Sequence, residues 1–198
     1  MTELVDRYDR KLTENVHLFK EGKIDRDLYW NHHSEYVRDF GKCVKNIGFE
    51  EAERQILAYF EETVQKQQWD HRLQLWVNAV FQFPNRKFIP YLTKMLQLEN
   101  NKIPYYTILD LLTYIPEEIG KYAVPGLCEA ISNNNPCWKE AFFQSAFQAL
   151  IFIGDEQGYD FICEACHSEV KWISKWATYY KNKWLLKPDD FHRCYAAL

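Results

Sequence analysis

Apolar residues recur along this chain with the spacing of one side of an α-helix. They occupy positions i, i+3, i+4 and i+7, which share one face because a helix has about 3.6 residues per turn. Four stretches have this spacing: Trp76, Ala79, Val80 and Phe83; Ile108, Leu111, Leu112 and Ile115; Ala146, Ala149, Leu150 and Ile153; and Ile173, Trp176, Ala177 and Tyr180. The first three are followed at once by Pro84, Pro116 and Gly154, residue types that end helices. The pattern predicts four amphipathic helices, each with one buried side.

A second kind of helix is predicted between these stretches, with a proline in its first turn. Residues 88–92 (FIPYL) resemble residues 123–127 (AVPGL), and Pro90 and Pro125 occupy the same place in both. Proline suits the start of a helix, because the N–H that it lacks would have no acceptor there. The junctions that follow Ile115 and Ile153 also match, 38 residues apart.

This alternation of helices is similar to the HEAT-repeat family over about residues 50–184. The resemblance depends on the spacing and on the Ile-Gly-Asp turn at residues 153–155. In such proteins a helical hairpin of roughly 30 to 40 residues buries its apolar side only against its neighbours. The resemblance implies an all-α fold, a HEAT-like helical-hairpin solenoid with an N-terminal helical cap. The last interval is shorter, which implies a capping repeat with altered packing.

Three further helices are predicted ahead of the repeats. Residues 3–20 carry apolar residues at near-helical spacing among charged ones. A second helix is expected from Asp25 to a stop at Gly41, with Asp25 or Asp27 as its N-cap. A third is expected over residues 49–67.

We expect these elements to form one domain over residues 1–198, because 198 residues of which 47% are hydrophobic can bury a sizeable core. Its parts are the N-terminal helices (1–67), the HEAT-like repeats (68–184) and a C-terminal tail (185–198). The N-terminal helices show no repeat signature, so they form either an elaborated cap or a partner-specific addition.

The net charge of −4 argues against nucleic acid as a general partner, because neutralising phosphates requires a basic surface. One basic cluster near the C-terminus is an exception: Lys171, Lys175, Lys181, Lys183 and Lys187. The sequence has no secretory signal at its start and no apolar segment long enough to span a bilayer. We therefore expect a cytoplasmic protein without a membrane partner, whose six cysteines stay reduced.

The sharpest chemical motif is the C-x-x-C-H string of Cys163, Cys166 and His167. It matches the pattern for covalent haem attachment, but that chemistry belongs to exported proteins, and cysteines at i and i+3 are an ordinary packing choice on a helix. A zinc site that adds His192 and Cys194 would need the tail to fold back. The sequence leaves metal binding by these residues open, and we expect no cofactor.

Motifs for catalysis are missing from the sequence. It has no glycine-rich phosphate loop, no H-E-x-x-H and no G-x-S-x-G string, so nothing supports an enzyme. The adjacent residues His32 and His33 point in different directions on a helix, and we expect them on a solvated polar face.

Positions opposite the buried stripes predict a binding face. In HEAT-like proteins the second helix of each hairpin lines a concave surface, so the resemblance implies that these residues line a groove. They form three rows: Gln74, Tyr106, Gln144 and Lys171; Asn78, Asp110, Gln148 and Lys175; and Gln82, Tyr114, Phe152 and Tyr179. Tyrosines and amides are typical of protein-binding surfaces. For Tyr106, Tyr114 and Phe152 the alternative is burial against the N-terminal helices.

Two functions fit this surface. Small, acidic, aromatic-rich helical chains with HEAT-like units resemble bacterial immunity proteins, which implies that the chain binds and occludes a cognate toxin; its acidity suits a basic nuclease toxin. The alternative is an enzyme similar to HEAT-like DNA glycosylases. That resemblance would place Trp138, Asp110 and Trp176 in a pocket and Lys171 and Lys175 against phosphates, although the net negative charge counts against it.

Overall fold

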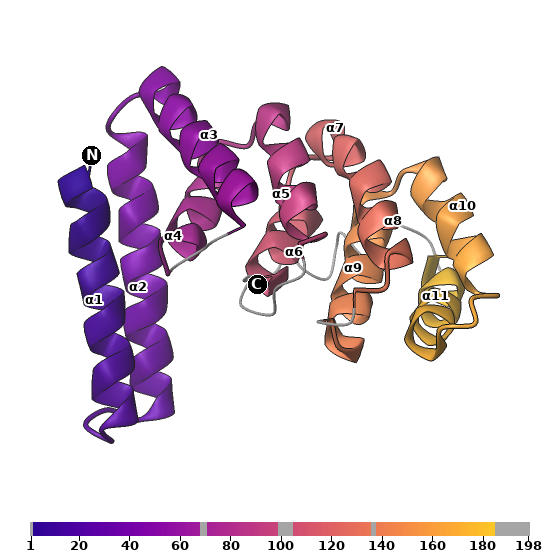
Figure 1. Ribbon diagram of the computed structural model, residues 1–198, viewed down its shortest axis with the longest axis horizontal. Coiled ribbons are helices and arrows are strands. Elements are labelled where there is room, and N and C mark those ends of the chain that lie inside the picture. Colours follow the sequence, from indigo (N-terminus) through magenta and orange to yellow (C-terminus); the bar gives the residue numbers. More distant parts are fainter. Residues whose placement is uncertain (1, 68–70, 99–104, 136–137, 185–198) are drawn as a thin grey trace. The chain divides into compact units, whose positions relative to one another are not determined.

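The computed structural model describes residues 2–67, 71–98, 105–135 and 138–184, and every regular element in these ranges is a helix (Figure 1). The all-α prediction is therefore confirmed. The elements are α1 (Thr2–Lys20), α2 (Arg26–Lys45), α3 (Phe49–Lys66), α4 (His71–Val80), the 3-10 turn η1 (Arg86–Phe88), α5 (Ile89–Met95), α6 (Tyr105–Tyr114), α7 (Glu117–Gly120), the 3-10 turn η2 (Lys121–Ala123), α8 (Val124–Ser132), α9 (Glu140–Ile153), α10 (Glu156–Ala165) and α11 (Lys171–Trp184).

The chain divides into two compact units, Met1–Pro84 and Asn85–Leu198. Helix α4 carries the first of the four predicted apolar stretches, yet it packs against α1, α2 and α3 and belongs to the first unit. The structural division thus falls after this helix, whereas the sequence pattern changes before it.

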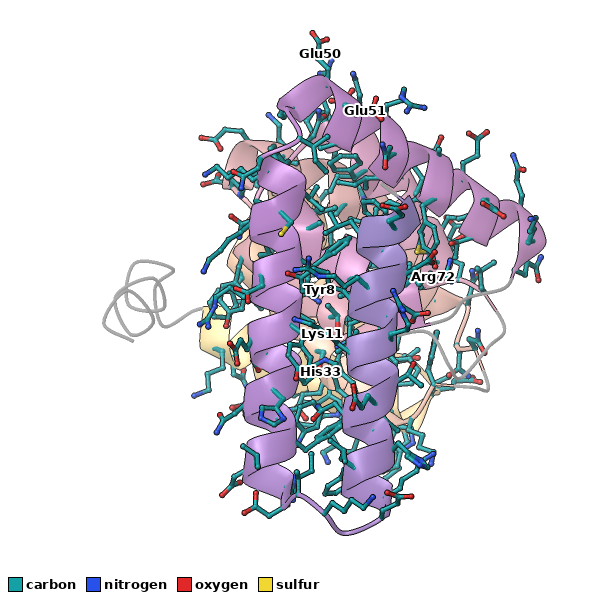
Figure 2. The ribbon with its side chains drawn as sticks, turned by 90° about the vertical axis from the view of Figure 1, so that its left-hand side faces the viewer. Tyr8, Lys11, His33, Glu50, Glu51 and Arg72 are labelled. Atoms are coloured by element: carbon teal, nitrogen blue, oxygen red, sulfur yellow. The ribbon has the colours of Figure 1, made fainter. Side chains whose placement is uncertain are left out.

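In the first unit, α1 and α2 lie side by side as a helical hairpin (Figure 2). Tyr8 and Lys11 of α1 lie between the two helices: the Tyr8 ring packs edge-on against Phe40 at 5.7 Å, and the Lys11 ammonium lies 4.9 Å from the centre of the Tyr36 ring. Of the two predicted N-caps, Asp25 is the one that caps α2, and its side chain accepts a hydrogen bond from the backbone N–H of Leu28 at 2.8 Å.

The predicted stop of α2 at Gly41 is wrong, because the helix continues to Lys45. Gly41 is buried, and a β-carbon there would lie 3.2 Å from Cγ of Gln82, so the glycine permits the close approach of the chain that follows α4. The apolar stripe also continues past it, since Phe40 and Val44 are both fully buried. A glycine in a helical pattern has here a packing role rather than a terminating one.

Polar side chains also join the helices of the first unit. The Asn15 side chain is buried, donates to the backbone carbonyl of Tyr29 at 2.9 Å, and lies 3.1 Å from Nδ1 of His32 through its oxygen. His33 points to a different neighbour, with its Nε2 2.9 Å from the amide nitrogen of Gln74. The two histidines do diverge, but they are half-buried and hydrogen-bonded rather than on a solvated face.

The second unit has two layers of helices, each with neighbours in direct contact (Figure 1). Helices α5, α8 and α10 form one layer and α6, α9 and α11 the other; α8 and α10 both pack against α9. The predicted apolar stripes form the cores of both units, and all their residues are buried except Trp176, which is half-buried.

The predicted proline-started helices occur in this unit as two copies of one local structure. A 3-10 turn leads into α5 with Pro90 in its first turn, and another leads into α8 with Pro125 in the same place. The two helices approach closely at Gly126, where a β-carbon would lie 2.5 Å from Cβ of Thr93. Thr93 is itself held by a hydrogen bond from its hydroxyl to the carbonyl of Ile89 at 3.0 Å.

None of the helices within the described ranges combines the length and the apolar character needed to cross a lipid bilayer.

Candidate functional site

Helix α6 presents three exposed residues of the predicted binding face. Tyr106 and Tyr114 keep 50% and 51% of their surface accessible, and Asp110 lies exposed between them, four residues from each. Burial against the N-terminal helices, the alternative for these two tyrosines, is not what the structure shows. Partial desolvation raises the pKa of Asp110, and its carboxylate has no hydrogen-bond or ion-pair partner in the part of the chain that the structure describes.

Helix α9 continues this surface. Gln144 is exposed, Gln148 is half-buried and accepts a long hydrogen bond from the hydroxyl of Tyr180 at 3.5 Å, and Phe152 is half-buried. The ring of Phe152 lies 6.2 Å from that of Tyr114 on α6. These two residues are 38 positions apart, so the offset seen between the junctions in the sequence is also the offset with which α6 and α9 pack.

Helix α11 contributes Lys171, Lys175 and Tyr179, all exposed, with Tyr179 at 47%. The rows drawn from the sequence put Lys175 beside Gln148, but in the structure Lys175 forms an ion pair with Glu140, 35 residues before it. The apolar stripe begins two residues into α11 and six residues into α9. If the two helices align near their starts, matching the stripes residue by residue misplaces α11 by four residues, about one turn.

Besides Phe152, eight of the predicted binding residues lie on these three neighbouring helices, all of them exposed or half-buried, and we name these eight the α6–α9–α11 face. They are Tyr106, Asp110, Tyr114, Gln144, Gln148, Lys171, Lys175 and Tyr179.

The remaining three predicted binding residues belong to the first unit. Gln74 is half-buried and contacts His33, and the half-buried Asn78 donates from its amide to the carbonyl of Gln74 at 2.8 Å. Gln82 is exposed and lies against Gly41. Both predicted binding residues within α4, Gln74 and Asn78, therefore make internal contacts, and Gln82 follows the helix.

Cys163, Cys166 and His167 are not arranged to share a metal ion. The Cys166 thiol donates to the carbonyl of Ile162 at 3.3 Å, and His167 is exposed just after α10. Among the residues that the structure describes, no three His, Cys, Asp or Glu side chains are placed to share a metal ion. His192 and Cys194 lie outside the described residues.

The residues suggested by the DNA-glycosylase resemblance have different environments. Trp138 is only 6% exposed, and its indole N–H donates to the carbonyl of Leu96 at 3.0 Å. Trp176 is half-buried, and its indole nitrogen is buried without a hydrogen-bond partner among the described residues. Asp110 is on the exposed side of α6. Trp138 is therefore a core residue, and its ring is not exposed for a base to stack on.

The first unit also contains an open pocket of about 470 Å³ that was not predicted from the sequence. Its lining comes from α1, α3 and α4: Val5, Arg54, Gln55, Ala58, Tyr59, Glu62, Arg72 and Trp76. Arg72 forms ion pairs with Asp6 at 3.2 Å and Asp9 at 3.3 Å, which join α4 to α1. No motif marks the pocket, because its lining residues come from separate helices.

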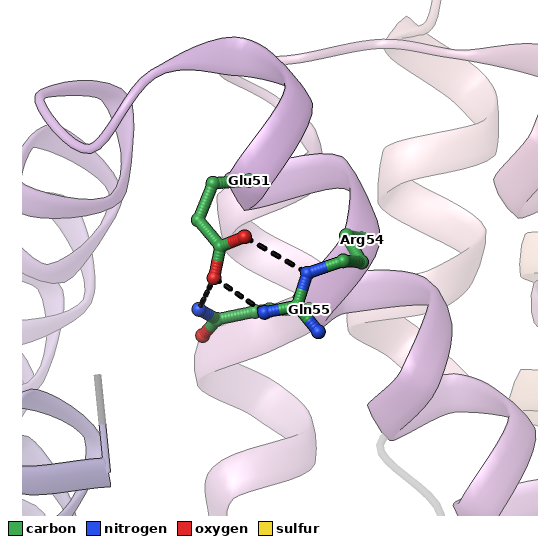
Figure 3. A network of polar contacts seen from close by, with 3 residues as sticks. All are labelled: Glu51, Arg54 and Gln55. Atoms are coloured by element: carbon green, nitrogen blue, oxygen red, sulfur yellow. Dashed lines mark hydrogen bonds and ion pairs between the residues drawn. The ribbon is translucent and has the colours of Figure 1, made fainter.

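The other arginine of this pocket belongs to a network within α3. The Glu51 carboxylate accepts two hydrogen bonds from Arg54 and one from Gln55 (Figure 3). The contact with Arg54, and then that with Gln55, lowers the pKa of Glu51 to about 2. The i, i+3 and i+4 spacing of these residues could have indicated this network, since such positions are neighbours on a helix.

Comparison with known proteins found no matching family model, no matching curated protein and no matching solved structure.

Proposed function

We propose that this protein is a HEAT-like helical-repeat module that binds another protein through the α6–α9–α11 face. The partner class that we propose is a cognate toxin, which the module would neutralise by occluding it. The proposed function is binding alone, and we assign no catalytic role to any residue.

Support for the repeat architecture comes from the second unit. The structure that begins α5 recurs at the start of α8, 35 residues later, and α6 packs on α9 with an offset of 38 residues. The two layers of this unit each consist of successive helices in contact. This is how helical hairpins stack when each buries its apolar side against the next.

The observation that carries the proposal is the stripe of Tyr106, Asp110 and Tyr114 on α6. A tyrosine supplies rigid contact area at low entropic cost. The two half-exposed rings are eight residues apart with Asp110 midway, and residues at this i, i+4 spacing follow one side of a helix. The carboxylate between them is partly desolvated and has no partner among the described residues. A lysine or arginine of the bound protein would provide that partner.

The test removes this stripe and measures binding. We expect the double variant Tyr106→Ala/Asp110→Lys to bind its partner at least tenfold more weakly, a loss of about 1.4 kcal/mol or more. The unmodified chain and the variant would each be used to capture proteins from a lysate of the source cells. The proteins captured would be identified by mass spectrometry, and the dissociation constant of a purified candidate would then be measured.

A matched control comes from the same unit. Tyr122→Ala/Asp160→Lys removes a tyrosine of equal exposure and reverses one exposed charge on η2 and α10, away from α6. We expect this control to bind normally and both double variants to keep the thermal stability of the unmodified chain. Equal loss of binding in the two variants, or no loss in the α6 variant, would contradict the proposal.

A further inference from the structure

We propose that the lysine and aromatic side chains of α11 accept an acidic segment of the protein partner. This inference rests on the proposed binding function and adds to it the chemistry of one part of the partner. The α11 ridge is defined as Lys171, Trp172, Lys175, Tyr179 and Lys183.

The lysines of the ridge lie over aromatic rings. The ammonium of Lys171 lies 5.2 Å from the centre of a ring of Trp172, and that of Lys175 lies 5.4 Å from the same residue. The ammonium of Lys183 lies 5.6 Å from the centre of the Tyr179 ring. Such contacts limit the motion of long side chains, so less freedom is lost when a carboxylate binds them.

The charge of α11 is opposite in sign to that of the whole chain. The chain has a net charge of −4, yet α11 contains four lysines and no acidic residue. Lys171 lies in the first turn, where the helix dipole disfavours a cation, so its place is not explained by the stability of the helix. Lys175 already binds the carboxylate of Glu140 from α9, which shows that a carboxylate can reach this side of the helix.

The size of the ridge suits a short segment of protein. From Lys171 to Lys183 the helix rises about 18 Å, a distance that about six extended residues span. Single-stranded nucleic acid also uses cations and aromatic rings. Its affinity grows with the number of phosphates neutralised, however, and four lysines on a chain of net negative charge neutralise few. The observations therefore favour an acidic protein segment.

The test uses a fluorescent peptide of about eight residues in which Glu alternates with Ser, long enough to cover the ridge. Binding would be followed by fluorescence anisotropy at an ionic strength of about 10 mM, where the screening length is about 30 Å. A Lys-Ser peptide and an oligothymidylate serve as comparison probes. We expect the acidic peptide to bind the unmodified chain most tightly and to be released by salt.

Three variants locate the binding. Lys171→Gln/Lys175→Gln/Lys183→Gln should weaken binding of the acidic peptide at least tenfold, whereas the corresponding Arg variant, which keeps the charges, should retain it. Lys42→Gln/Lys45→Gln/Lys66→Gln makes the same change of charge in the first unit and should bind normally.

Three results would overturn the inference: no binding of the acidic peptide to the unmodified chain, equal binding by the α11 Gln variant, or tighter binding of the oligothymidylate. These results concern α11 alone. If they occur while Tyr106→Ala/Asp110→Lys still abolishes capture of a protein partner, the proposed function stands and only the acidic nature of the segment is refuted.

Discussion

Helices α4 and α6 carry the same apolar pattern but use their polar positions differently. In α4 of the first unit, Gln74 contacts His33 of α2 and Asn78 contacts the backbone of Gln74. In α6 of the second unit, Tyr106 and Asp110 hold the equivalent positions and are exposed. An amphipathic pattern therefore predicts the helix and its buried side, but not which polar residues a neighbouring helix will cover.

The difference extends to how the two units hold together. In the first unit the interfaces between helices include buried or half-buried polar contacts such as those of Asn15 and Arg72. In the second unit the helices meet mainly through apolar side chains and through the close approach of α5 and α8 at Gly126. Its buried hydrogen bonds from Trp138 to Leu96 and from Asn135 to Leu98 join segments outside the helices. We therefore expect the two units to respond to different kinds of substitution.

The largest effect is expected from removal of the polar contact between α1 and α2. Asn15→Ala would remove the hydrogen bond to the carbonyl of Tyr29 and the one shared with the ring of His32. Since the loss of one such hydrogen bond costs about 1 to 1.5 kcal/mol, we expect the free energy of unfolding to fall by about 2 to 3 kcal/mol. Urea unfolding followed by circular dichroism measures this change.

Asn31→Ala is the matched control, because Asn31 is exposed on α2 and loses the same amide. We expect its effect to stay within about 0.5 kcal/mol. If Asn15→Ala proves no more harmful than Asn31→Ala, polar contacts do not hold the first unit together, and the contrast between the units disappears.

The next effect concerns close packing in the second unit. Gly126→Ala would place a β-carbon 2.5 Å from Cβ of Thr93, which is buried and cannot move aside easily. We expect a loss of about 1 to 2 kcal/mol in the free energy of unfolding, as for other overpacked cores. The same urea titration applies.

Gly158 provides the control for this substitution, since it is also the third residue of its helix. A β-carbon there would lie 3.6 Å from the nearest atom, an ordinary contact distance. Gly158→Ala should leave stability unchanged or raise it by up to about 1 kcal/mol, because alanine favours the helix more than glycine does. A loss of stability in Gly158→Ala equal to that in Gly126→Ala would show that contact with Thr93 is not the cause.

The sequence predicted the helices of both units well because their buried sides follow one period. Local chemistry alone predicts Asp25 as one of two candidate caps, and Pro90 and Pro125 as helix starts. The continuation of α2 past Gly41 was not predicted, since the role of that glycine depends on Gln82, which is distant in sequence. Local patterns predict where helices form, whereas the role of a residue such as Gly41 depends on contacts between elements.

For the candidate site, the sequence placed Tyr106, Asp110 and Tyr114 opposite the buried stripe of α6 but left open whether the two tyrosines are buried, and it did not predict the alignment of α11. The contact between Tyr114 and Phe152 follows the 38-residue offset, whereas Lys175 meets Glu140 instead of lying beside Gln148. The pocket of the first unit was missed altogether, because Arg72 and Trp76 line it together with residues of other helices. Both failures concern packing between helices, which a period within one helix does not encode.

The smallest effect is expected from a polar contact that lies within one helix instead of between two. Contacts with Arg54 and then Gln55 lower the pKa of Glu51 from 4.5 to about 2. A carboxylate with a lowered pKa stabilises the fold fully above pH 4.5, and this contribution is lost as the pH falls through about 2. Glu51→Gln should therefore lower the melting temperature slightly at pH 7, and the difference from the unmodified chain should vanish near pH 2.

Glu50→Gln removes an equal charge one residue earlier, where the side chain points away from the helices (Figure 2). A pH-dependent difference seen for Glu51→Gln and not for Glu50→Gln would assign it to the contacts with Arg54 and Gln55. Both glutamates are on the exposed side of α3, where solvent screens charge interactions, so neither variant should approach the effect of Asn15→Ala. If Glu51→Gln destabilised the chain as much as Asn15→Ala does, polar contacts within a helix would matter as much as those between helices, and the contrast drawn here between the two units would need another cause.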